Sequence, residues 1–129
     1  MLHLLKLKKP RPKNPPNLGQ QGEQRAKKFL QNKGLRFLAS NFRTPYGEID
    51  LIFRDGAQIV FVEVKTRATI GKGQPYEAVD PRKLNHIQLA AQTYLQQNHL
   101  NSSSSRIDVV SIVLKPKTQI QHLINVTGF

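Results

Sequence analysis

Helical periodicity of the apolar positions marks two segments of the chain. The first spans Gly19–Lys33, and Gly34 follows where a helix needs a C-terminal cap. The second starts at Asp80, a residue suited to an N-cap, continues with Pro81 at the first helical position, and runs to about Asn98. The apolar stripes consist of Ala26, Phe29 and Leu30 in the first segment, and of Leu84, Ile87, Ala91, Tyr94 and Leu95 in the second. The pattern therefore predicts two amphipathic helices.

Alternation with a period of two predicts five strands. An Asp-Gly pair at 55–56 is a strong hairpin signal, so the second and third strands should be antiparallel neighbours, with the first three forming a meander. The second helix then lies between the third and fourth strands, which implies a mixed sheet. The fold class is α/β, a mixed β-sheet flanked by helices in the order α-β-β-β-α-β-β. The expected strands are Leu35–Phe42, Gly47–Phe53, Gln58–Thr66, Ile107–Leu114 and Gln119–Val126.

Charged residues interrupt the second and third strands on one face. If the Asp-Gly pair forms the two-residue turn, Glu48 lies opposite Glu63, and Asp50 is the diagonal neighbour of Glu63. Lys65 continues the same face. Opposed carboxylates repel each other, and neither strand propensity nor packing explains this choice. A divalent cation would explain it, because Mg²⁺ and Mn²⁺ bind hard oxygen ligands.

The arrangement suggests a site that cleaves phosphodiesters. Asp50 and Glu63 would hold Mg²⁺ or Mn²⁺, which polarises a phosphate oxygen and lowers the pKa of an attacking water. Lys65 would orient that water or stabilise the developing charge. Glu48 is either a further ligand or a neighbour of the ligands. The alternative is a purely structural cluster in which Lys65 neutralises the carboxylates.

The charge balance favours a polyanionic partner. Twenty Lys and Arg residues against eight Asp and Glu residues give the 129-residue chain a net charge of +12. Nucleic acid fits such a charge best, although membrane surfaces attract it too. Residues 1–18 hold five positive charges, four prolines and no acidic residue, which predicts a flexible basic tail, either a phosphate-binding arm or a solubilising segment. Residues 19–129 are basic by themselves and predict a single domain.

The absence of cysteine excludes disulfides, thiol nucleophiles and cysteine-bound zinc. It also suits a reducing compartment. The sequence contains no apolar run long enough for a signal core or a membrane span. We therefore expect a cytoplasmic protein without a membrane partner.

The charged residues of the predicted hairpin resemble a known sequence signature. Asp50 and the triplet Glu63-Val64-Lys65, in a hairpin after an N-terminal helix, are similar to the PD-(D/E)XK motif of restriction-endonuclease-like proteins. This resemblance implies a restriction-endonuclease-like sheet. It also implies that Asp50 and Glu63 are the metal-binding acids and that Lys65 is the lysine of the motif.

A narrower resemblance covers roughly Gly19–Thr127. The segments Gly-Glu-Ile-Asp-Leu-Ile (47–52), Phe-Val-Glu-Val-Lys-Thr-Arg (61–67) and Arg-Ile-Asp-Val-Val (106–110) resemble the YraN family of small bacterial proteins. Glu23 resembles the helix carboxylate that completes the metal site in Holliday-junction-resolvase-like proteins. Its alternative role is that of a first-turn glutamate favoured by the helix dipole.

Several cations flank the expected site. Arg43, Arg67 and Lys72 could guide a nucleic-acid backbone, and Arg82 and Lys83 could contact phosphate where the second helix starts. All five could equally be ordinary solvated residues. Asp108, in contrast, is expected to form a structural ion pair with Arg106 or with a neighbouring strand.

The sequence is compatible with three functions. The first is a metal-dependent endonuclease-like protein acting on DNA, branched or partly single-stranded, for which a homodimer is a natural form by analogy. The second is a non-catalytic nucleic-acid-binding module, and the third is a basic partner of a DNA-processing enzyme. The carboxylates favour the first, because without a cation Glu48, Asp50 and Glu63 would repel a phosphate ligand.

Overall fold

A computed structural model describes residues 16–71 and 79–127. Its elements follow the predicted order and confirm the α/β class. None of the helices in these two ranges is long and apolar enough to cross a membrane. Most of the predicted tail, residues 1–15, and the predicted phosphate contact Lys72 lie outside the described residues. The elements are α1 (Leu18–Asn32), β1 (Arg36–Thr44), β2 (Gly47–Asp55), β3 (Gln58–Thr69), α2 (Pro81–Gln97), β4 (Ser105–Lys115) and β5 (Gln119–Leu123).

Both helices begin and end at residues suited to those positions. The side chain of Asn17 accepts a hydrogen bond from the backbone of Gln20 and thereby caps α1, whose first residue is Leu18. Gly34 follows this helix with a φ of 94°. At α2, the side chain of Asp80 accepts a hydrogen bond from the backbone nitrogen of Arg82 at 2.7 Å. The predicted caps are therefore confirmed, and α1 begins one residue before its predicted start.

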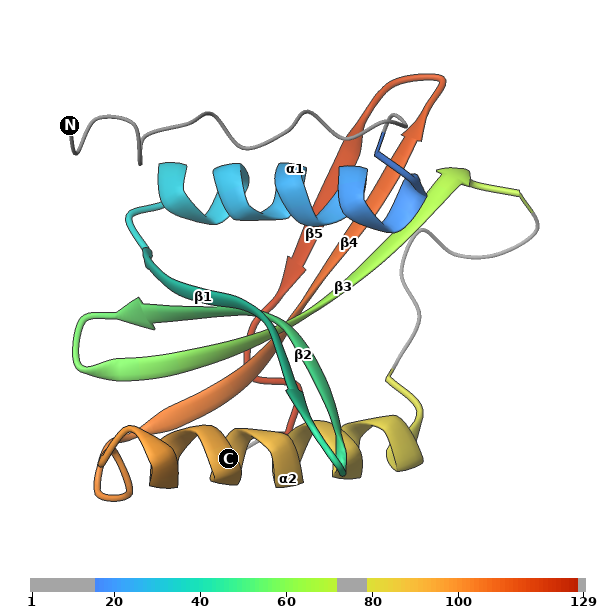
Figure 1. Cartoon of the computed structure of the whole chain (residues 1–129). Helices are drawn as coiled ribbons and strands as arrows, with labels where there is room; N and C mark the ends of the chain where they lie inside the picture. Colours follow the sequence, from blue (N-terminus) through green and yellow to red (C-terminus); the bar gives the residue numbers. More distant parts are fainter. Residues whose placement is uncertain (1–15, 72–78, 128–129) are drawn as a thin grey trace, which may run out of the picture.

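The five strands form one mixed sheet in the order β1-β2-β3-β4-β5. The first three are an antiparallel meander, β4 is parallel to β3, and β5 is antiparallel to β4. As Figure 1 shows, α1 covers one face of the sheet and α2 the other. The connection through α2 explains how β3 and β4 can run parallel.

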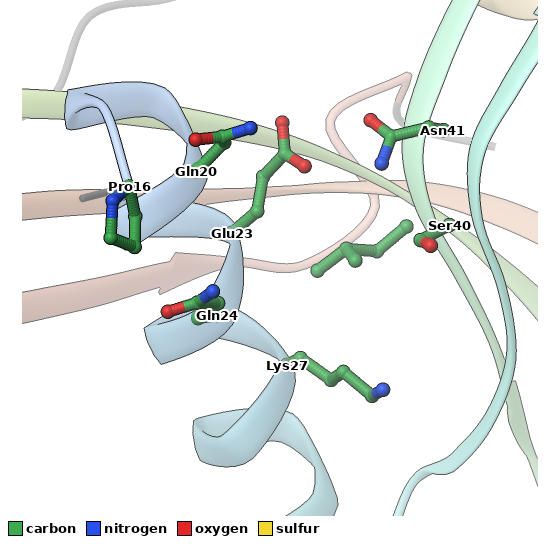
Figure 2. A pocket seen from close by; sticks show the side chains of 8 residues that line it. Pro16, Gln20, Glu23, Gln24, Lys27, Ser40 and Asn41 are labelled. Atoms are coloured by element: carbon green, nitrogen blue, oxygen red, sulfur yellow. The ribbon is translucent and has the colours of Figure 1, made fainter. Parts of the chain in front are cut away.

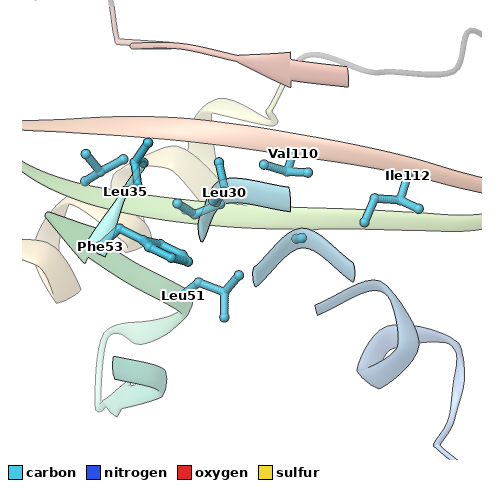
Figure 3. Close-up of a cluster of buried hydrophobic side chains, with 9 residues drawn as sticks. Leu30, Leu35, Leu51, Phe53, Val110 and Ile112 are labelled. Carbon is cyan, nitrogen blue, oxygen red and sulfur yellow. The ribbon is translucent and has the colours of Figure 1, made fainter. Parts of the chain in front are cut away.

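Alternating side chains of the strands divide the core into two layers. Ala26 and Leu30 of α1 pack on one layer, and Ile87 and Ala90 of α2 pack on the other. The layer under α1, part of which Figure 3 shows, includes Leu35, Leu51, Phe53, Val60, Val62, Val110 and Ile112. The layer under α2 includes Ile49, Ile52, Ile59, Phe61, Tyr94 and Ile107.

The register of β2 and β3 differs from the prediction. Asp55 pairs with Gln58, so the turn consists of Gly56 and Ala57 instead of Asp55 and Gly56. Gly56 takes the first central position with a φ of 62°, where a type II′ hairpin favours glycine. The predicted opposition of Glu48 and Glu63 is therefore wrong. Because the partner changes by two positions, the side chains from Leu51 to Asp55 keep their predicted faces, whereas Ile49, predicted on the face of Leu51, packs under α2 instead.

Beyond the pair of Leu51 and Val62, β2 and β3 diverge. No further rung joins the two strands among the described residues. Leu51 packs under α1 while Ile49 packs under α2, so the alternation of β2 breaks at Asp50. On the neighbouring strand, Asn41 has a φ of 51°. The β1–β2 hairpin consequently bends away from β3 toward α2, as Figure 1 shows.

Two glycines allow close approaches that fix this geometry. A Cβ at Gly47 would lie 3.1 Å from the Cβ of His86, so the end of the β1–β2 hairpin lies directly against α2. A Cβ at Gly22 would overlap the hydroxyl of Thr66. Gly22 therefore lets the first turns of α1 lie close to the far end of β3.

Asp108 is fully buried and fully hydrogen-bonded. It contacts Arg106 Nε at 3.0 Å, His122 Nε2 at 2.8 Å and the backbone nitrogen of Asn125 at 2.9 Å. Burial alone would raise the pKa of Asp108, but the hydrogen bonds from His122, Arg106 and Asn125 outweigh it and lower that pKa. Arg106 also pairs with Asp55 at 3.0 Å. The predicted structural ion pair of Asp108 with Arg106 is confirmed.

We expect Gly22→Ala to lower the free energy of unfolding by about 1–3 kcal/mol, because the new methyl group overlaps Thr66. Gly19→Ala is the matched control, since its Cβ would meet only Asn17 Oδ1, at 3.6 Å. That control should be neutral or stabilised by up to about 1 kcal/mol through helix propensity. Urea denaturation followed by circular dichroism measures both, and equal stability of the two variants would contradict the close approach of α1 to β3.

Asp108→Ala should destabilise the protein by about 3–5 kcal/mol, because it leaves Arg106 without its buried partner. Asp55→Ala removes the exposed partner of the same arginine and should cost at most about 1 kcal/mol. The comparison uses the same denaturation measurement. Similar losses in the two variants would show that burial does not set the strength of this network.

Candidate active site

The carboxylate of Asp50 lies where β2 and β3 separate. Its Oδ2 accepts a hydrogen bond from the backbone nitrogen of Val64 at 2.8 Å. In a continuous ladder a carbonyl of β2 would accept that bond, and a buried N–H without an acceptor is costly. The side chain of Asp50 thus replaces the missing backbone partner and stays fixed in the gap between the strands.

Glu63 is the most perturbed carboxyl of the site. Its side chain is 9% exposed and lies 3.5 Å from the ammonium of Lys83, between Oε2 and Nζ. Burial first, then the hydrogen bond with Asp50 and the negative charge of Asp50, raise the pKa of Glu63 to about 8, whereas Lys83 acts in the opposite direction. The raised pKa therefore favours the protonated form of Glu63 around neutral pH.

Two further glutamates approach this pair through Asn41. With its amide nitrogen turned toward the carboxylates, Asn41 donates to Glu23 Oε1 at 3.2 Å and to Glu48 Oε1 at 3.1 Å. Burial, followed by the charges of Asp50 and Glu48, raises the pKa of Glu23, and the hydrogen bond from Asn41 opposes that change. Arg43 Nε also lies 3.6 Å from Glu48 Oε1. Four carboxylates are thus electrostatically connected.

Sequence reasoning missed Asn41, which links the two glutamates. The only signal was an asparagine inside a strand pattern, where this residue is depleted, together with its tolerance of positive φ. Figure 2 shows the amide of Asn41 on β1 facing the carboxylate of Glu23 on α1. The two residues lie on the wall of a cavity of about 300 Å³. The cavity is lined by Pro16, Gln20, Glu23, Gln24, Lys27, Ser40, Asn41 and Leu51.

The donor set fits a magnesium-like ion bound by two carboxylates. Mg²⁺ is usually held by one or two carboxylates and completes its shell with water and substrate phosphates. Asp50 and Glu63 supply two such groups in hydrogen-bond contact. Within residues 16–71 and 79–127, no group of three or more acidic or histidine side chains could hold a metal. Glu23 and Glu48 are held by Asn41, and their role as ligands stays a prediction.

The structure places the predicted cations at different distances from the carboxylates. Arg43 and Lys83 contact Glu48 and Glu63 directly. Of the other predicted cations, Lys65 and Arg67 are half-buried on β3, and Arg82 is exposed in the first turn of α2. The site thus carries positive charge from three elements, β1, β3 and α2.

The raised pKa of Glu63 sets the sign of a pH effect. Between pH 4.5, the ordinary value, and about 8, the native state binds more protons than the unfolded state, so stability falls as the pH rises. The loss is about 1.4 kcal/mol for each unit by which the pKa is raised. Glu63→Gln should make this slope much smaller, leaving the part that comes from the raised pKa of Glu23, whereas Glu48→Gln should keep most of it. Urea denaturation in EDTA at pH 5.5 and 8.5 measures the slope, and equal slopes in wild type and Glu63→Gln would refute the assignment.

Comparison with known families and proteins gives one consistent match. A family model described as "Uncharacterised protein family UPF0102" matches residues 22–112, which include all five predicted catalytic and metal-binding residues. Three relatives, each named UPF0102 protein, illustrate the similarity. The relative from Paenarthrobacter aurescens is 43% identical over 110 residues (82% of this chain, 89% of the relative), that from Syntrophomonas wolfei 44% over 109 (84% and 95%), and that from Syntrophus aciditrophicus 46% over 99 (77% and 78%).

Proposed function

The chain belongs to the UPF0102 family, the family of YraN type, and on this premise we propose that it is a Mg²⁺- or Mn²⁺-dependent endonuclease that hydrolyses phosphodiester bonds in DNA. The observation that carries the proposal is the contact of Asp50 with Glu63 in the gap between two diverging strands. Structural carboxylates would each be expected to pair with a cation. Glu63 does contact the ammonium of Lys83, but it also lies against a second carboxylate, that of Asp50, and burial together with this contact raises its pKa.

Within this proposal, Asp50 and Glu63 would hold the ion. When bound, the ion would supply a polarised phosphate oxygen and an activated water. Lys65, two residues beyond Glu63 on the same face of β3, would orient the water or stabilise the developing charge. Lys83, whose ammonium already lies at Glu63, would contribute positive charge where the phosphate arrives.

DNA as the substrate rests on charge and on the family signature. The net charge of +12 favours a polyanion, and the cations around the carboxylates would position its backbone. The likeness to the PD-(D/E)XK signature and to junction-resolving members points to branched or partly single-stranded DNA. The same proposal includes a cytoplasmic location and, by analogy with junction-cutting enzymes, a homodimer.

A second candidate is a nucleic-acid-binding module without catalysis, or a basic partner of a DNA-processing enzyme. Two observations favour it. The described residues contain no group of three metal ligands, and Lys83 already offsets part of the negative charge of Glu63. Against it, phosphate would meet the carboxylates of Glu23 and Asp50, whose negative charges already act on each other, at the centre of its binding site.

A cleavage assay on plasmid, flapped and four-way-junction DNA with Mg²⁺ or Mn²⁺ tests the proposal. Asp50→Asn keeps an oxygen that can accept the hydrogen bond of Val64 but removes the charge, so we expect cleavage to fall about 100-fold or more with folding intact. Lys65→Ala should give a loss of similar size. Asp55→Ala is the matched control, because this aspartate ends the same strand and pairs with Arg106.

Two results would reject catalysis on these substrates. One is the absence of cleavage by the wild type, and the other is unchanged cleavage in both Asp50→Asn and Lys65→Ala. The binding module predicts a different outcome, namely a salt-sensitive DNA affinity that survives or increases when Asp50 loses its charge. Binding titrations at several salt concentrations on the same variants separate the two candidates.

A further inference from the structure

The turn between β1 and β2 exposes an aromatic ring in a fixed position. Pro45 and Tyr46 form a two-residue turn between the paired residues Thr44 and Gly47. The hydroxyl of Thr44 donates to the carbonyl of Gly47 at 3.0 Å and accepts from the backbone nitrogens of Tyr46 and Gly47, each at 3.1 Å. Proline further restricts the first position of the turn. Tyr46 itself is 56% exposed.

This turn lies beside the candidate active site. Gly47 packs directly on His86, one helical turn after Lys83, and Lys83 pairs with Glu63. Along β2, Tyr46 and Asp50 are four residues apart, which corresponds to about 13 Å of extended chain. At the stacked spacing of about 3.4 Å per nucleotide, that distance spans about four nucleotides.

Charge and rigidity indicate what contacts the ring. The side chains of Arg43, at the end of β1 before the turn, and of Lys83, on the helix against which the turn packs, are 78% and 51% exposed and can contact phosphates. A second copy of the chain would bring further positive charge to these two cations, whereas a nucleic acid brings phosphates. A nucleobase has an uncharged face that stacks on an aromatic ring, but only an unpaired base offers that face to a protein. A fixed ring also loses little conformational freedom on binding.

We propose that Tyr46 stacks on an unpaired base of the bound DNA, about four nucleotides from the phosphodiester at Asp50 and Glu63. The stacking selects strands that are branched or partly single-stranded over fully paired duplex. The inference rests on the proposed function, since it takes DNA as the substrate, and it adds the residue that recognises the structure of that substrate.

Fluorescence of 2-aminopurine, placed at successive positions in the single-stranded arm of a flapped duplex, tests the stacking. The assay contains Ca²⁺ in place of Mg²⁺, because Ca²⁺ is also a hard cation that binds oxygen ligands. Wild type should quench the probe at one or two neighbouring positions, and Tyr46→Phe should do the same. Tyr46→Ala should lose the quenching and bind the flap about 5- to 150-fold more weakly, with less than a twofold change on paired duplex.

Ile124→Ala is the matched control, because Ile124 is equally exposed at 57% but follows β5, at the opposite edge of the sheet from β1. It should leave flap binding and quenching unchanged.

The inference is overturned if Tyr46→Ala weakens flap and duplex binding equally, if Tyr46→Phe behaves like Tyr46→Ala, or if Tyr46→Ala changes the sedimentation coefficient, which would indicate a protein contact. Cleavage is scored separately: quenching without cleavage rejects only the nuclease, and cleavage without quenching rejects only the stacking.

Discussion

The separation of β2 from β3 at Asp50 is the constraint on which the rest of the molecule depends. In a continuous ladder the register of Leu51 with Val62 would place Asp50 opposite Glu63, but a backbone carbonyl of β2, and not the carboxylate, would accept the hydrogen bond from Val64. The hydrogen bond from the backbone nitrogen of Val64 to Asp50 offsets the cost of the separation, because the carboxylate accepts the hydrogen bond that a backbone carbonyl of β2 no longer accepts. The same divergence sends the β1–β2 hairpin toward α2. One aspartate thus shapes the backbone and supplies a charge to the site that this shape creates.

The carboxylates are held together by partners of unequal strength. Glu63 contacts the ammonium of Lys83, Glu48 contacts the guanidinium of Arg43, and Glu23 accepts a hydrogen bond from the neutral amide of Asn41. A cation bound at Asp50, as proposed, would relieve repulsion throughout the cluster, and Glu63, whose pKa is raised, would release its proton. Metal binding would thereby be coupled to local packing.

Periodicity and cap residues predicted the order of the elements, because they depend on neighbours in sequence, such as Gly34 and Asp80. The turn after Asp55 was misplaced because glycine suits either central position of a hairpin turn, yet the error of two positions kept the faces of the paired residues Leu51 to Asp55. The contact of Lys83 with Glu63 could not be predicted, since it depends on how the crossover helix packs. Alternation alone also assumes an even ladder, so it missed the divergence at Asp50 and the bridging role of Asn41.

The Asp108 network gives the two ends of the sheet different rigidity. It ties β4 to the segment after β5 and, through Arg106, to the β2–β3 turn, while Lys33 extends it by its contact with His122 to the end of α1. At the other end, β2 and β3 share no rung beyond Leu51 and Val62 among the described residues. Free energies of local opening should thus rise from the site toward the turn. Local opening of the gap between β2 and β3 beside the carboxylates can then occur while the molecule as a whole stays folded.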